Sequence, residues 1–273
     1  MRRVVLTVAL HGALVVATAA TLLPLLWMVS ASLMPAGEAT ALPPRLVPST
    51  VTFAHYRDLF VRLRLARAVA NTAGLATAVT ALALLVNALA GYAFAKLPFR
   101  GRDRLLQVLL AALVVPAQVA MLPLFLELKA LGAIDTYWAV VIPGIASISG
   151  IFLVRQHALA LPDAVLDAAR VDGAGELRVF AAVALPLCAP VLATLAVLTF
   201  LGTWNDFLWP LIVLADQDLY TLPVALANLA GEHVQDTELM MAGAVLTVLP
   251  VVVLFVVLQR HYLAGIMAGG VKE

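Results

Sequence analysis

The residue types that carry out catalysis are few in this chain and are poorly spaced for it. There are only three lysines, Lys96, Lys129 and Lys272, and none follows a glycine, whereas a phosphate-binding Walker loop needs Gly-Lys-Ser/Thr. The five histidines, at positions 11, 55, 157, 233 and 261, lack the spacing of metal ligands. Neither Gly-x-Ser-x-Gly nor His-Glu-x-x-His occurs. We therefore expect no enzyme activity, no cofactor and no metal site.

Polar residues inside long apolar runs are the next candidates, because their burial in hydrocarbon is costly. Asp206 is the clearest case: it interrupts residues 179–215, which otherwise carry no charge, and Asn205 precedes it. Two interpretations are open. The pair forms a polar patch on a solute path or on an interface with a partner subunit. Alternatively, Asp206 lies near the outer headgroups, satisfied by water or by the indole N–H of Trp204 or Trp209.

A polar stretch at residues 161–186, called the coupling loop below, lies between two apolar runs and has an internal pattern. Pro162 can open a helix, since proline is tolerated at the first helical position, and an Ala-rich segment follows. Gly173 indicates a turn with positive φ. A second short helical stretch leads to Pro186. The pattern predicts two short helices at an angle outside the bilayer, a shape suited to docking; the alternative is an ordinary solvated loop with an i,i+3 pair between Asp167 and Arg170.

Composition indicates that a bilayer surrounds most of the chain. Of its 273 residues, 63% are hydrophobic and 12% charged, with a mean hydropathy of +1.03, whereas soluble domains average about 25% charged residues. The net charge of +1 and the lack of a basic stripe give no reason to expect a nucleic-acid partner. The lone Cys188 excludes an internal disulfide. Charge-poor runs predict six transmembrane helices, at roughly 4–33, 68–95, 105–126, 136–157, 182–214 and 239–260.

Lysine and arginine in the loops predict the orientation, because cytoplasmic loops carry an excess of both. The segments that lie inside when the amino terminus is inside are rich in them: Arg2 and Arg3; Lys96, Arg100, Arg102 and Arg104; Arg155, Arg170 and Arg178; Arg260 and Lys272. The third outer loop has no basic residue and five acidic ones, although residues 34–67 weaken the pattern with five arginines. We expect both termini and the coupling loop to face the cytoplasm.

The first apolar run has two interpretations. Arg2-Arg3, an apolar stretch and Ala17-Thr18-Ala19 are compatible with a cleaved secretory signal. The apolar run continues to Leu33, however, which is too long for a signal core. We expect a retained first helix.

The coupling loop resembles the cytoplasmic signature of the inner-membrane subunits of binding-protein-dependent ABC importers. That signature is Glu-Ala-Ala, three residues, Gly, nine residues, Ile, any residue, Leu-Pro. The matching positions here are Asp167, Ala168, Ala169, Gly173, Val183, Leu185 and Pro186. Asp167 stands for Glu with one methylene fewer, and Val183 stands for Ile. Further segments resemble the smaller permease subunit of maltose-type carbohydrate importers, at 91–102, 123–136, 204–210 and 268–272.

The resemblance implies an all-α integral membrane protein: a single permease domain over 1–273, with six transmembrane helices and type I ABC importer architecture. It implies docking of ATPase subunits on the matching positions, and an ATPase-interface tail that includes Gly269 and Lys272. The implied partners are a second homologous permease, two cytoplasmic ATP-hydrolysing subunits, an external solute-binding protein and a sugar. The implied location is the plasma (inner) membrane of a bacterium or archaeon.

Two alternatives differ in solute or in class. The first is an ABC importer permease for a polyol, glycerol phosphate or polyamine. The second is a stand-alone secondary transporter, for which inverted repeats and broken helices with ion-coordinating residues would be expected. No convincing repeat is visible in the sequence.

Overall fold

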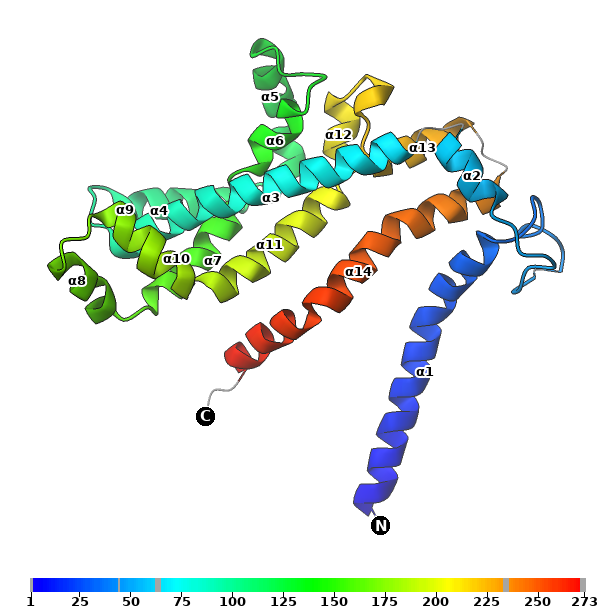
Figure 1. Cartoon of the computed structure of the whole chain (residues 1–273), viewed down its shortest axis with the longest axis horizontal. Coiled ribbons are helices and arrows are strands. Elements are labelled where there is room, and N and C mark those ends of the chain that lie inside the picture. Colours follow the sequence, from blue (N-terminus) through cyan, green and yellow to red (C-terminus); the bar gives the residue numbers. More distant parts are fainter. Residues whose placement is uncertain (1, 44, 62–64, 233–235, 271–273) are drawn as a thin grey trace. The chain divides into compact units, whose positions relative to one another are not determined.

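The computed structural model describes residues 2–43, 45–61, 65–232 and 236–270, and in these ranges the backbone forms helices and loops without a strand. The chain forms two compact units, whose helices are labelled in Figure 1. The first comprises residues 1–67 and 222–253. The second comprises residues 68–221 and 254–273.

The first unit contains an apolar helix and a polar anchoring point. Its helices are α1 (Arg2–Ala31), α2 (Ala54–Val61), α13 (Leu222–Glu232) and the first half of α14 (Thr237–Gly270). Ala31, Met34 and Ala39 form a small core. Glu238 is 1% exposed, and its side-chain Oε1 accepts a hydrogen bond of 2.7 Å from the Ala39 backbone N–H, which gives this buried polar group a partner.

The second unit holds the coupling loop and most of the transmembrane helices. Its elements are α3 (Leu65–Lys96, which starts in the first unit), α4 (Arg102–Ala112), α5 (Ala117–Ala130), α6 (Trp138–Gly144), α7 (Ile148–Leu159), α8 (Asp163–Val171), α9 (Glu176–Val179), a π-helical turn η1 (Phe180–Ala184), α10 (Leu185–Leu187), α11 (Ala189–Trp204), α12 (Leu208–Val213) and a short 3₁₀ turn η2 (Gln217–Leu219). One apolar core joins α3, α5, α6 and α12 around Val79, Val140 and Trp209. A second core lies under the coupling loop.

The lengths and hydropathy of the helices agree with an integral membrane protein. Four described spans are long and apolar enough to cross a bilayer: Ala9–Ala31, Leu65–Lys96, Trp138–Leu159 and Thr237–Val256. Two bent pairs also qualify, α4 with α5 at 106°, and the segment Glu176–Leu187 with α11 at 77°. If each bent pair is one span, the described residues give six, which confirms the predicted all-α fold class.

The structure interrupts three of the helices that we expected to be continuous. The expected helix 105–126 is divided into α4 and α5, and the residue before α5 is Pro116, which has no N–H for the helical ladder. The expected helix 136–157 breaks at residues 145–147. The expected helix 182–214 ends at Trp204 and restarts at Leu208. The last two breaks belong to the candidate site.

Candidate functional site

The coupling loop folds as the two short helices that its sequence predicts. Pro162 precedes α8, and Asp163 occupies the first turn, where a negative charge favours the helix. After α8 the chain reverses at Gly173, which has φ +85°, the left-handed conformation expected of this glycine. α9 then begins at Glu176.

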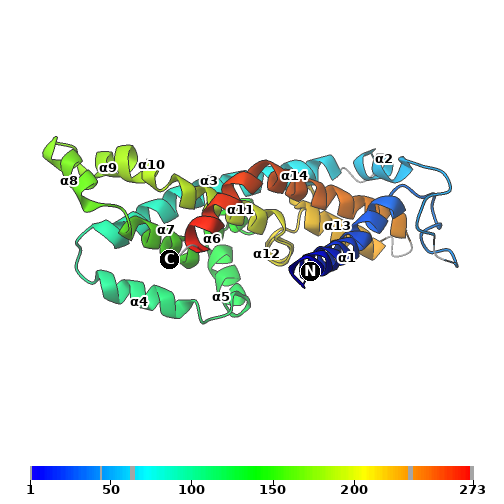
Figure 2. The same ribbon diagram turned by 90° about the horizontal axis from the view of Figure 1, so that it is seen from below.

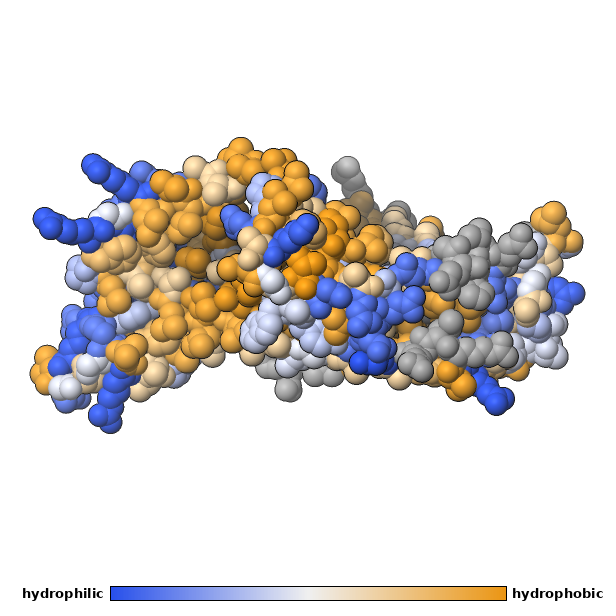
Figure 3. Space-filling model, turned by 90° about the horizontal axis from the view of Figure 1, so that it is seen from above, coloured by the Kyte–Doolittle hydropathy of each residue, from blue (hydrophilic) through white to orange (hydrophobic). Residues whose placement is uncertain are grey.

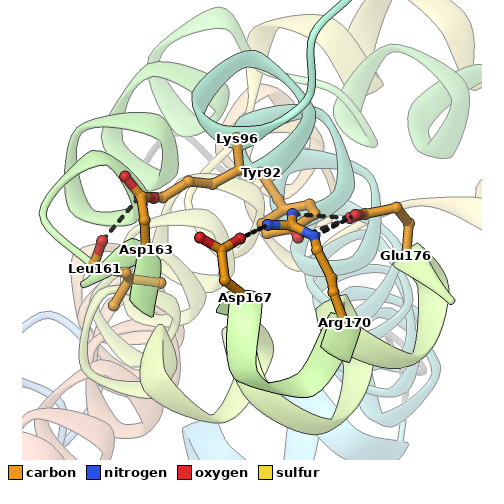
Figure 4. Close-up of polar contacts among 7 residues, drawn as sticks. All are labelled: Tyr92, Lys96, Leu161, Asp163, Asp167, Arg170 and Glu176. Carbon is orange, nitrogen blue, oxygen red and sulfur yellow. Dashed lines mark hydrogen bonds and ion pairs between the residues drawn. The ribbon is translucent and has the colours of Figure 1, made fainter. Parts of the chain in front are cut away.

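A clamp of charged side chains closes the coupling loop on itself (Figure 4). Arg170 Nε donates to Glu176 Oε1 over 2.6 Å, and Nη2 donates to Oε2 of the same residue over 3.3 Å. Arg170 Nη1 donates to Asp167 Oδ1 over 2.7 Å, which confirms the predicted i,i+3 pair. Glu176 first and Asp167 second raise the pKa of Arg170, so the guanidinium stays charged. The clamp fixes α9 against α8.

Two residues of the last turns of α3 tie the same loop to a transmembrane helix (Figure 4). Tyr92 OH donates to Glu176 Oε2 over 3.1 Å. Lys96 Nζ donates to Asp163 Oδ1 over 2.6 Å and to Leu161 O over 2.8 Å. The Lys96 ammonium, by hydrogen bond and by charge, lowers the pKa of the Asp163 carboxyl. The sequence predicts a cytoplasmic-side position for Lys96 but no contact of Tyr92 or Lys96 with this loop, although their i,i+4 spacing at the end of a helix beside a polar loop is a usable signal.

Apolar packing joins the coupling loop to α3 as well. Leu166 and Val179 have no exposed surface and pack in a core with Tyr92, Phe180 and Ala184. Tyr92 and Phe180 place their ring centroids 5.3 Å apart. The signature residues Ala169, Val183 and Leu185 are partly buried and pack against this core. These three positions therefore hold the loop in shape, and Ala169 does not lie on its outer face.

The outer face of the coupling loop is small and apolar. Ala164, Ala168 and Val171 are exposed and follow one another at i, i+4 and i+7, so they form one stripe on α8. Val171 is 87% exposed, and Leu177 on α9 is 78% exposed. We call Ala164, Ala168, Val171 and Leu177 the outer stripe. Asp167 is also exposed beside it. Val171 and Leu177 were missed from the sequence, although large apolar residues in a polar loop outside the bilayer were the available signal.

The two remaining breaks interrupt two neighbouring helical segments, α6–α7 and α11–α12, which run antiparallel to each other. At one end, Trp209 Nε1 in α12 donates to Ala139 O in α6 over 2.9 Å. At the other, His157 Nε2 in α7 donates to Leu187 O over 3.2 Å. With α6 beside α12 and α7 beside α11, the two breaks lie near each other (Figure 1). Irregular backbone is tolerated at membrane depth only where protein covers it or where it lines a water-filled cavity.

A buried amide on α3 holds the first of these breaks. Asn87 is fully buried, and its Oδ1 accepts a 3.0 Å hydrogen bond from the backbone N–H of Ser147, the residue that caps α7. Gly150 leaves room for this amide, because a Cβ there would lie 3.2 Å from Asn87 Nδ2. Ala146 and Ser149 are exposed at the same break. Asn87 is therefore a hydrogen-bonding contact between α3 and the start of α7.

Asp206 lies at the second break, close to the backbone N–H groups of Phe207 and Trp209 at the start of α12. Its side chain is half-buried. The Trp209 indole donates to Ala139 O instead, so our interpretation that it satisfies Asp206 is wrong. Asn205 is exposed, and its Nδ2 donates to Leu201 O over 2.8 Å, while its Oδ1 has no partner among the described residues.

The structure describes only part of the carboxyl-terminal tail that is expected to contact the ATPase. Gly269 lies in the last turn of α14, and Lys272 lies outside the described residues. Within the described residues no group of three or more histidine, cysteine, aspartate or glutamate side chains could hold a metal ion.

Comparison with known proteins matches residues 87–267 to the family described as the binding-protein-dependent transport system inner membrane component. The arabinooligosaccharide transport system permease of Halalkalibacterium halodurans is 38% identical to this chain, over 91% of this chain and 90% of the length of that permease. The trehalose transport system permease of Mycobacterium tuberculosis is 35% identical over 92% of each chain.

A solved structure shows the same fold. It is a chain of a bacterial ABC transporter involved in the import of the acidic polysaccharide alginate, with a TM-score of 0.83 over 94% of this chain and 96% of that chain, at 24% identity. The chain belongs to the family of inner-membrane components of binding-protein-dependent ABC transport systems.

Proposed function

We propose that this chain is one of two permease subunits of an ATP-driven carbohydrate importer, and that its outer stripe docks into a cytoplasmic ATPase subunit. The observation that carries the proposal is the build of the coupling loop: a small, exposed apolar stripe on a helix pair that charged and apolar contacts fasten to α3. A partner can approach alanine side chains closely, and Val171 and Leu177 supply apolar contact at the tip. The partners are a second related permease, two ATPase subunits and an external solute-binding protein. The chain itself has no catalytic part.

The contacts of the loop indicate how force would pass into the membrane. Movement of α8 reaches α3 through Lys96, Tyr92 and Leu166, and it reaches α11 through the continuous segment from α9 to α10. The contacts of Tyr92 and Lys96 make α3 a direct recipient of the movement.

The paired breaks support a place for the solute path. Discontinuous helices near the membrane midplane form solute sites in other transporters, because their free backbone and capping groups can bind polar ligands. Exposed Asn205 and Ser149, with half-buried Asp206 between α11 and α12, give this region hydroxyl and amide groups of the kind that bind sugar hydroxyls. The named relatives carry oligosaccharides or trehalose, which favours a carbohydrate as the solute.

Docking is tested by adding bulk to the outer stripe. Ala168→Trp should abolish co-purification of the ATPase subunits, and Ala182→Trp is the matched control, because Ala182 is exposed on η1 away from that stripe. Asp167→Glu should be tolerated, and Asp167→Lys should not. Full ATPase retention and full uptake by Ala168→Trp would show that the coupling loop is a passive loop.

The solute and the tail have separate tests. Uptake by a deletion strain across a panel of oligosaccharides, polyols, glycerol phosphate and polyamines identifies the solute, and uptake restricted to a non-carbohydrate would refute the sugar assignment. The purified chain alone should neither bind ATP nor transport in liposomes. Deletion of residues 268–273 should alter ATPase regulation if Gly269 and Lys272 reach the ATPase, and unchanged regulation would refute that contact.

A further inference from the structure

The turn between α3 and α4 borders an open basic cavity that the proposed function does not use. The cavity measures about 700 Å³ and is lined by seven consecutive residues, Pro98, Phe99, Arg100, Gly101, Arg102, Asp103 and Arg104. Three guanidinium groups and one carboxylate give it a net charge of +2. Its size falls within the range of small-molecule sites, about 300–1,000 Å³.

Two of the three arginines are available to a ligand. Arg102 Nε lies 3.3 Å from Asp103 Oδ1, and its Nη1 donates to Leu97 O over 3.5 Å, so Arg102 is engaged in holding the turn. Arg100 and Arg104 are exposed, and among the described residues neither has an ion pair or a side-chain hydrogen bond. Gly101, with φ +82°, sets the sharp turn between them.

Apolar side chains adjoin the arginines. Phe99 is 41% exposed in the cavity wall. On α4, Leu105 is 49% exposed and Val108 is 66% exposed, and their i,i+3 spacing puts them on one face. Figure 2 shows the open loop that joins α3 to α4. In Figure 3 hydrophilic side chains gather at the left end, where Figure 1 places this turn and α8, beside a broad apolar surface.

We propose that this turn binds an anionic phospholipid: Arg100 and Arg104 hold its phosphate, and its acyl chain lies along Leu105 and Val108. Guanidinium groups bind phosphate oxygens with paired N–H donors, which gives both strength and geometry. Basic clusters beside membrane helices bind acidic headgroups in this way. A soluble anion would use the arginines but would leave the apolar face of α4 without a role. The proposal stands apart from the docking of ATPase subunits and from the identity of the solute.

The test compares lipid retention by the native complex that contains this chain. The complex is reconstituted in nanodiscs with equal amounts of phosphatidylglycerol and phosphatidylcholine, released, and weighed by native mass spectrometry. Arg100→Gln with Arg104→Gln should lower the preference for phosphatidylglycerol by roughly fivefold per arginine. Arg45→Gln with Arg57→Gln, which removes the same charge from the segment 34–61, is the matched control and should retain the preference. Arg100→Lys with Arg104→Lys should restore part of it.

Each outcome bears on the proposal. An unchanged preference in the Arg100→Gln, Arg104→Gln protein overturns it, provided that the protein still assembles with its partners. Displacement of the bound species by inorganic phosphate, without any difference between the two lipids, also overturns it and identifies a free-phosphate site. Equal losses in the control protein would show a general charge effect and would overturn the assignment to this turn.

Discussion

Replacing Arg170 with leucine removes the hydrogen bonds that close the coupling loop, and its cost follows from their geometry. The guanidinium makes contacts of 2.6 and 3.3 Å to Glu176 and 2.7 Å to Asp167. The Arg170 side chain is 33% exposed, and the carboxylates are 46% and 63% exposed, so solvent weakens both ion pairs. Pairs of this kind contribute about 0.2–1 kcal/mol each, and the bidentate contact to Glu176 lies at the upper end.

The expected loss is therefore about 1–2 kcal/mol in the stability of α9 against α8, which multiplies the open population roughly 5- to 30-fold. Leu166 and Val179 remain buried in their core, so the loop should loosen without unfolding. The transmembrane helices lie outside the clamp, so the variant should still insert and assemble.

Hydrogen exchange of the backbone amides in residues 163–179 measures the opening directly. Arg170→Leu should exchange faster by the factor above and should hydrolyse more ATP per solute imported. Arg178→Leu is the control, because Arg178 is exposed on α9 and has no ion pair among the described residues. Identical exchange and coupling in the two variants would refute the argument that the clamp makes the loop a rigid element.

Three further predictions follow from other contacts. Gly91→Leu should reduce the yield and thermal stability of the complex, because a Cβ at position 91 would lie 2.7 Å from Val154 and 3.0 Å from the Arg155 backbone N; Gly74→Leu, which meets open space, is the control. Lys96→Met should loosen α8 at neutral pH. In the unchanged protein the pKa of Asp163 is lowered below 3.8, so the Lys96–Asp163 contact stabilises α8 fully above pH 3.8. The contact is lost only as the pH falls through the lowered pKa. Hydrogen exchange in α8 that becomes faster between pH 7 and 5 would contradict this account. Asp206→Ala should lower uptake while ATPase subunits still co-purify, because it removes a polar group at the break between α11 and α12; normal uptake with a normal yield would exclude a role on the path.

The shape of the coupling loop could be predicted because local physics specifies it. Gly173 takes positive φ because the turn requires it, and Asp167 meets Arg170 because helical geometry brings i and i+3 together. Which alanine side chains of α8 point into the core and which point outward could not be predicted in the same way. Ala169 turns inward because Leu166 packs under the loop, and that packing depends on Tyr92, which is distant in sequence.

The interruptions of the transmembrane helices show the limit of hydropathy. An apolar run reports that a segment lies in the bilayer, and it does not report whether the backbone ladder is continuous. Pro116 gave a local signal for the bend between α4 and α5. The break at residues 145–147 cannot be predicted from its own segment alone. The group that accepts the N–H of Ser147 exposed by this break is Asn87, which lies on another helix.

Helix α3 connects the coupling loop to the break between α6 and α7. Asn87, Tyr92 and Lys96 all belong to α3, and nine residues separate the first from the last, which is about 14 Å along a helix. Asn87 holds the break between α6 and α7, and the other two hold the coupling loop. Because the helix between them is continuous, a shift of the coupling loop along α3 displaces the acceptor on which the Ser147 cap depends. The Asn87 side chain is fully buried and its Nδ2 has no partner among the described residues, so release of the Ser147 N–H would leave the whole amide unpaired. The break must therefore follow α3, or α3 must stay still.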